Sequence, residues 1–174
     1  MARPTKPLYY LEIAKATARR STCKHYQCGA IIVKNDRIIS TGYNGAPAGC
    51  PNCSDQGHCM LELNHIPEKQ WEAICPAVDA EINAIISASR ELCLYATMYV
   101  YCWDCKKRDV KQNMESSTFA KRVIINSGLN EIIYADPSGI GRSDNDGIHY
   151  GYRTLKVEAL LHSYDHLLDP RMLN

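Results

Sequence analysis

The stretch Ala77-Val78-Asp79-Ala80-Glu81-Ile82-Asn83-Ala84-Ile85-Ile86-Ser87-Ala88-Ser89-Arg90 decides the fold of this chain. Its isoleucines recur at helical spacing and its alanines keep one surface slim, so it predicts a buried helix packed closely on a sheet. Two carboxylates, Asp79 and Glu81, lie where this helix begins. A carboxylate held against low-dielectric walls has its pKa raised or is bound to a cation. The amino end of the helix is therefore a candidate functional site.

A purely structural interpretation of the two carboxylates is also open. Asp is a common N-cap residue, and Glu is favoured in a first helical turn because the unpaired amides and the helix dipole attract negative charge. The sequence around the helix is needed to distinguish the functional interpretation from the structural one.

Length and composition indicate one globular domain spanning residues 1–174. The chain has 174 residues, of which 45% are hydrophobic and 22% charged, enough for a proper core. The formal net charge of +1 gives no electrostatic basis for binding extended nucleic acid or a membrane surface, although single nucleotides are allowed. Because no apolar run has the length of a membrane span and the first residues lack the apolar core of a signal peptide, we expect a cytoplasmic protein.

Nine cysteines are a high number for such a chain. In a reducing compartment they suggest metal binding rather than disulfides, and two C-x-x-C pairs, Cys50 with Cys53 and Cys102 with Cys105, agree with that. Cys28 and Cys93 lie inside apolar runs, where a cysteine behaves as a small buried hydrophobe.

Residues 50–75 form a long, weakly periodic insertion that needs something to order it. A structural zinc bound by thiolates would do so, whereas the alternative is scattered thiols in an unordered insertion. The candidate ligands are the following thiols: Cys53, Cys59 and Cys75, with Cys50 or Cys23 as the fourth.

The remaining segments predict an α/β fold. Two β-rich runs around a turn indicate a hairpin, and a strand, a helix and a strand in succession indicate a parallel βαβ unit. We therefore expect a mixed sheet with helices on both faces. The predicted elements are helix 8–20, strands 28–33 and 37–42, the central helix, strand 96–102, helix 118–126, strand 131–135, a loop over 137–149 and a closing helix over 155–168.

Several segments together resemble the deoxycytidylate deaminase family of the cytidine deaminase fold. They run in the family's order over about three quarters of the chain. The resemblance implies a three-layer α/β/α fold with a mixed five-stranded sheet, a small-molecule nucleotide ligand and a homo-oligomer, usually a hexamer. The matching segments are Arg20-Ser21-Thr22-Cys23, Gly29-Ala30-Ile31-Ile32-Val33, Ser40-Thr41-Gly42-Tyr43-Asn44-Gly45-Ala46-Pro47, Ala80-Glu81-Ile82-Asn83-Ala84-Ile85, Ala96-Thr97-Met98-Tyr99-Val100 and Ile124-Ile125-Asn126-Ser127-Gly128-Leu129.

The family's chemistry uses a zinc ion held by one His or Cys and two Cys. The zinc lowers the pKa of a bound water, and a Glu that is not a ligand carries the protons. In the family pattern, H-A-E on the central helix and a later P-C-x-x-C, Glu81 matches the proton carrier. Asp79 stands in place of the ligand His, and Ser117 and Ala120 stand in place of the two thiolates. The resemblance also implies that Asn44 contacts the nucleotide.

A displaced catalytic zinc site is one way to restore the missing ligands. Cys102 and Cys105 follow the strand over 96–102, near the edge where the pocket is expected. With Asp79 they would supply one carboxylate and two thiolates, a set that zinc accepts.

Three functions stay open from the sequence. The first is a divergent hydrolytic deaminase that converts dCMP, or a related deoxycytidine nucleotide, to dUMP. The second is a deaminase-fold protein without catalytic zinc that binds a nucleotide or a partner subunit. The third is a metal-free enzyme that uses Asp79 and Glu81 as paired carboxylates.

Overall fold

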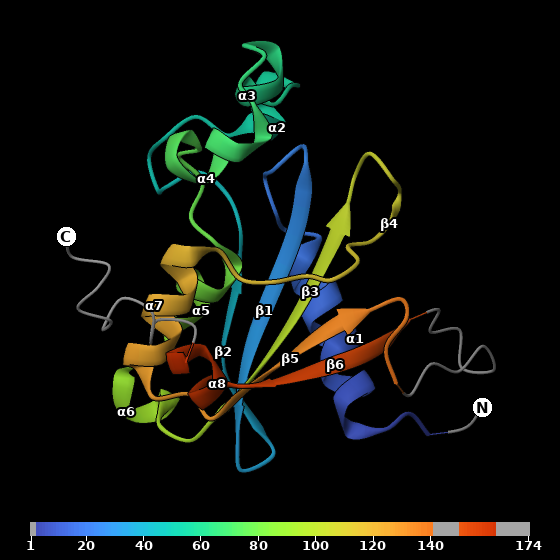
Figure 1. The fold of residues 1–174 in the computed structure, drawn as a ribbon, viewed down its shortest axis with the longest axis vertical. Coiled ribbons are helices and arrows are strands. Elements are labelled where there is room, and N and C mark those ends of the chain that lie inside the picture. Colours follow the sequence, from blue (N-terminus) through green and yellow to red (C-terminus); the bar gives the residue numbers. More distant parts are fainter. Residues whose placement is uncertain (1–2, 141–149, 163–174) are drawn as a thin grey trace, which may run out of the picture.

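A computed structural model describes residues 3–140 and 150–162. Their strands form one mixed sheet in the order β2-β1-β3-β5-β6, with the short β4 paired to β3 (Figure 1). β3 and β5 are parallel, as the predicted βαβ unit requires, and the other pairs are antiparallel. The sheet thus has one strand more than the five expected. The strands are β1 (Tyr26–Lys34), β2 (Arg37–Tyr43), β3 (Thr97–Asp104), β4 (Asp109–Val110), β5 (Glu131–Asp136) and β6 (Gly151–Lys156).

Helices cover both faces of the sheet, which confirms the predicted three-layer α/β/α fold. Alternate side chains of β1 separate the two cores: Ile31 packs with the residues of α1 (Lys6–Ala18), whereas Ile32 packs on the opposite face. That opposite face carries the helices that position the site: α5 (Ala80–Ser87), α7 (Thr118–Ser127) and α8 (Val157–His162).

The cysteine-rich insertion folds into short helical turns at the top of Figure 1. Each has three or four residues, so the segment contributes little regular structure of its own. They are α2 (Cys53–Gln56), α3 (Met60–Leu63), η1 (Glu68–Gln70) and α4 (Trp71–Ile74).

Two helices pack so closely on the sheet that one position in each of the strands beneath them has room only for glycine. A Cβ atom at Gly29 would lie 2.3 Å from the carbonyl oxygen of Ala14 in α1. One at Gly42 would lie 2.3 Å from the backbone nitrogen of Ala84 in α5. The slim helix surface predicted for α5 therefore rests directly on the backbone of β2.

Two predicted helix boundaries need correction. The central helix ends at Ser87, and Ser89 instead caps a separate turn, α6 (Arg90–Cys93), by accepting a hydrogen bond from the Leu92 backbone N–H. The closing helix begins only at Val157, because Leu155 lies in β6 opposite Ile132. The rest of that predicted helix, beyond His162, and residues 141–149 of the predicted loop lie outside the described residues.

Within the described residues, none of the helices combines the length and the apolar character that a bilayer crossing requires.

Candidate functional site

The carboxylate of Asp79 joins the amino ends of α5 and α7. Asp79 occupies the N-cap position of α5, but its side chain makes no capping hydrogen bond. Instead, the Ser117 hydroxyl donates to Asp79 Oδ2 at 2.6 Å, while Ser117 Oγ caps α7 by accepting from the Ala120 backbone N–H at 3.0 Å. Asp79 therefore stands at the N-cap position, as the structural interpretation expects, but its carboxylate does not cap the helix. Its side chain serves a contact between two helices.

Glu81 lies beneath this contact and is only 2% exposed. The Ser116 hydroxyl donates to Glu81 Oε1 at 2.8 Å, and the same hydroxyl is 2.8 Å from the Tyr134 hydroxyl on β5. Burial is the main cause that raises the pKa of Glu81, and the nearby charge of Asp79 raises it further. The first turn of α5 therefore holds a carboxyl group that releases its proton less readily than an exposed one.

Both carboxylates line one large cavity of about 650 Å³. Burial also raises the pKa of Asp79, although the hydroxyl of Ser117 counteracts this. The facing wall is built from β1, the cysteine-rich insertion and the segment before α7, and it includes His25, Tyr26 and Lys111. A cavity of this size with a few polar groups is typical of small-molecule sites.

The cysteine-rich insertion is joined to the rest of this wall by polar and aromatic contacts of His25. His25 Nδ1 lies 2.5 Å from Glu62 Oε1, and the same oxygen lies 3.1 Å from Lys106 Nζ. The His25 ring also meets the Trp71 ring edge-on, with centroids 4.6 Å apart. These contacts tie two of the short helices to β1, so the insertion forms part of the cavity rather than an appendage.

Asn44 lines the cavity, and three hydrogen bonds hold its side-chain amide in place. Its Oδ1 accepts hydrogen bonds from the Ser21 hydroxyl at 2.6 Å and from the Cys28 backbone N–H at 2.8 Å. Its Nδ2 donates to the Tyr26 carbonyl at 2.9 Å. Since one N–H of the amide is left over, the nucleotide contact expected of Asn44 stays a prediction.

The residues that the resemblance aligns with the catalytic zinc ligands do not fit zinc. Asp79 offers a carboxylate that already accepts a hydrogen bond from Ser117, and Ala120 has no donor atom. One carboxylate and one hydroxyl are a poor set for an ion that takes nitrogen, sulfur and charged oxygen ligands.

The displaced zinc site is not assembled either. Cys102 lies opposite Cys28 in the antiparallel pairing of β1 and β3, and the two sulfurs form a disulfide. Cys102 therefore has no thiolate to offer, which corrects its predicted metal role and, for these two cysteines, the expectation that the chain has no disulfides. Cys105 follows β3, where its backbone N–H donates to the His25 carbonyl at 3.0 Å. Over residues 3–140 and 150–162, no three His, Cys, Asp or Glu side chains are grouped to hold a metal ion.

The predicted structural thiols lie in one neighbourhood, although not in a closed ligand set. Cys23, Cys59 and Cys75 line the same cavity. Burial raises the pKa of Cys75, and the neighbouring Cys53 and Cys59 raise it further. Cys50, in contrast, is exposed.

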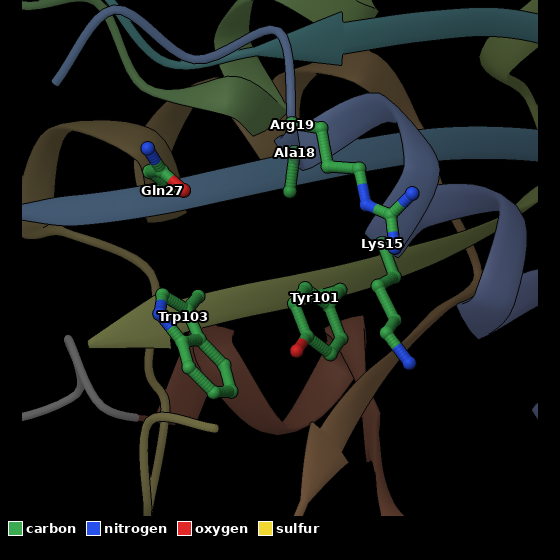
Figure 2. A pocket seen from close by; sticks show the side chains of 6 residues that line it. All are labelled: Lys15, Ala18, Arg19, Gln27, Tyr101 and Trp103. Carbon is green, nitrogen blue, oxygen red and sulfur yellow. The ribbon is translucent and has the colours of Figure 1, made fainter. Parts of the chain in front are cut away.

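A second, smaller cavity of about 230 Å³ lies beside the carboxyl end of α1 (Figure 2). Lys15 and Arg19 extend from the helix, while Tyr101 and Trp103 project from β3. No carboxylate is among the residues that line it, so it lacks the acid and base groups of the larger cavity.

Three residues of the larger cavity, Ser116, Lys111 and His25, escaped sequence analysis, and so did Tyr134, whose hydroxyl contacts Ser116. The four come from separate segments that meet only when the sheet forms. A partial signal was available for the serine, because the pair Ser116-Ser117 directly precedes a predicted helix and one of the two is expected to cap it.

The family model described as "Cytidine and deoxycytidylate deaminase zinc-binding region" matches residues 4–136. A deoxycytidylate deaminase of Mycobacterium phage D29 is 37% identical over 129 residues, covering 70% of this chain and 98% of that protein. A deoxycytidylate deaminase of Enterobacteria phage T4 is 32% identical, covering 72% of this chain and 75% of that protein.

The fold also matches a solved structure. The dCMP deaminase of cyanophage S-TIM5, solved in complex with dCMP and dUMP, superposes with a TM-score of 0.54 at 22% identity and covers 77% of this chain and 83% of that one. Together with the matched family model, these relatives show that the chain belongs to the cytidine and deoxycytidylate deaminase family.

Proposed function

We propose that this chain is a hydrolytic deaminase of dCMP or a closely related deoxycytidine nucleotide. The observation that carries the proposal is Glu81, which is buried at the wall of the 650 Å³ cavity and stands at the family's proton-carrier position. Relatives of the chain named deoxycytidylate deaminase support the same substrate class.

The chemistry needs proton transfers that two carboxyl groups can perform. Water adds to C4 of the pyrimidine, the C4–N bond breaks and ammonia leaves. Glu81 in its protonated form gives a proton to ring nitrogen N3, and Asp79 takes the proton of the attacking water. Asp79 then returns that proton to the departing amine, and Glu81 recovers one from the new hydroxyl. Because the residues at the catalytic zinc positions do not fit zinc, no step is assigned to a metal.

Turnover of dCMP by protein treated with a chelator tests this proposal. We expect release of dUMP and ammonia at a rate that excess EDTA leaves unchanged within about twofold, since the carboxyl groups need no metal. Loss of turnover on chelation, with recovery on adding zinc, would contradict the metal-free assignment.

A second candidate is nucleotide binding without turnover. The hydrogen bond between Ser117 and Asp79 favours this second candidate, and so does Ala120, which has no donor atom. With these side chains at the positions aligned with the metal ligands, the catalytic metal of the family would not bind. Saturable dCMP binding in calorimetry without release of ammonia would establish this second function instead of the first.

We also propose that the cysteine-rich insertion binds a structural zinc. Thiolates suit zinc, and the thiols are near neighbours: Cys53 and Cys75 raise the pKa of Cys23, and Cys53 and Cys59 raise that of Cys75, in each case in addition to burial. The matched family model is a zinc-binding region, which supports zinc in general.

Zinc content tests the structural site. We expect about one zinc per chain, and its removal should lower the unfolding temperature, because metal binding adds to folding stability. Cys59→Ser should lose the metal, whereas Cys93→Ser, in the core and outside the insertion, should keep it. Equal zinc content in both variants would contradict this assignment. Homo-oligomeric assembly and a cytoplasmic location stay predictions from the sequence.

A further inference from the structure

Lys111 is fixed at the rim of the larger cavity by its own backbone. It directly follows β4, and its backbone N–H donates to the Cys102 carbonyl in β3 at 2.8 Å. The side chain is half-buried and lines the cavity that contains Asp79 and Glu81. A short hairpin therefore places Lys111 in the wall of the cavity that also contains the two carboxylates.

The surroundings of the ammonium group are partly aromatic. Lys111 Nζ lies 4.1 Å from the centroid of the Tyr26 ring, a distance at which the ring face attracts a cation. The carboxylates of Glu81, Asp104 and Asp79 act on it electrostatically and raise its pKa, against the stronger lowering by burial. Lys107 is the other cation close enough to act on it.

Lys111 differs from the other lysine of the cavity wall. Lys121 forms an ion pair with Glu115 at 2.8 Å, so its charge is already balanced. Lys111 makes no ion pair within 4 Å over the part of the chain that the structure describes. Its N–H groups are therefore available to a ligand in the cavity.

A cation suits the wall that carries Asp79 and Glu81. Burial disfavours a negative charge on either carboxyl group, and a cation in the same cavity offsets part of that cost. Among the described residues, Lys111 is the unpaired cation whose charge acts on both.

We propose that Lys111 supplies the positive charge of the nucleotide cavity in place of the metal, by donating a hydrogen bond to the pyrimidine end of the ligand. This inference rests on the proposed function, because it assumes that a deoxycytidine nucleotide enters this cavity with its base toward Glu81. A phosphate contact is the alternative role for a lysine here. The nearby carboxylates argue against it, since they would repel a phosphate at the same place.

Calorimetric binding of two probes, dCMP and deoxycytidine, tests the inference. We expect Lys111→Met to weaken binding of both probes by about 10- to 100-fold, the usual effect of losing a hydrogen bond to a charged group. Lys111→Arg should bind within about threefold of the wild type, because it keeps the charge. Lys156→Met is the matched control, because Lys156 pairs with Glu131 and is not among the residues that line the cavity; it should bind both probes as the wild type does.

Four outcomes would overturn the inference. Unchanged binding of both probes by Lys111→Met removes its basis, and weaker binding of dCMP alone identifies a phosphate contact instead. If Lys111→Arg binds as poorly as Lys111→Met while its unfolding temperature is unchanged, shape rather than charge is responsible. If the wild type binds neither probe, the proposed function fails, and this inference fails with it.

Discussion

Glu81→Gln is expected to lower the rate of dCMP deamination by about 100- to 10,000-fold, the usual contribution of a positioned proton-transfer group. Gln keeps the shape of the side chain and can still accept the hydrogen bond from Ser116, but it has no proton to give to the ring nitrogen. The affinity for dCMP should therefore change by only a few fold. Rates of ammonia release and calorimetric affinities measure the two effects separately.

Glu115→Gln is the control for that experiment. Glu115 also lines the cavity, but its side chain is 63% exposed and pairs with Lys121. We expect its turnover within about threefold of the wild type, because a surface ion pair contributes little. A similar loss of rate in both variants would show that negative charge in the cavity matters, and not the proton on Glu81.

Unfolding measurements show whether Glu81→Gln loses its deamination rate because the protein unfolds. Burial raises the pKa of Glu81 above its ordinary 4.5, so the folded chain binds this proton more tightly than the unfolded chain does. The contribution of Glu81 to the free energy of unfolding is fully present at low pH, and it decreases as the pH rises through the raised pKa. Gln does not ionise. Glu81→Gln should therefore be more stable than the wild type at about pH 9 and close to it at about pH 5.

The triple variant Asp79→His, Ser117→Cys and Ala120→Cys is expected to bind one zinc ion more per chain than the wild type. The side chains of Asp79 and Ser117 already touch at 2.6 Å, and Ala120 lies one helical turn further along α7, with its N–H on Ser117 Oγ. One imidazole and two thiolates from these positions would form the three-ligand set of a catalytic zinc, with Glu81 beside it.

Zinc content by elemental analysis measures this gain, and the comparison with the wild type removes the contribution of the cysteine-rich insertion. The double variant Ser117→Cys and Ala120→Cys lacks the third ligand and should hold the additional zinc much more weakly in a competition with a chelator. Zinc content equal to the wild type in the triple variant would show that these three positions do not surround one point. Loss of the Ser117 cap should lower stability by about 1 kcal/mol, which is tolerable for this purpose.

The fold was predictable because its signals are local. The spacing in residues 77–90 indicates a helix, and the β-rich runs that became β1, β2, β3 and β5 each carry their pattern within a few residues. Leu155 was placed in a helix because it falls in register with the apolar residues that follow it. Its pairing with Ile132 is a contact across the sheet that no short window contains.

The site was less predictable because its members meet through tertiary structure. Glu81 was found from its place on the helix, but its hydrogen-bond partner Ser116, and the Tyr134 hydroxyl that contacts Ser116, come near it only after α7 packs on the sheet that contains β5. The disulfide between Cys28 and Cys102 follows from the strand register, and counting cysteines suggested metal instead.

The backbone contact between Gly42 and α5 separates the permanent part of this protein from the replaceable part. The helix that carries Glu81 rests on main-chain atoms of β2, so this contact stays the same whichever side chains neighbour it. Asp79 and Ser117 lie at the N-cap positions of α5 and α7, whereas Ala120 is fully buried in the core. The two cap positions can therefore be exchanged with the backbone contact left in place, which makes the cavity a scaffold for installing new reactivity.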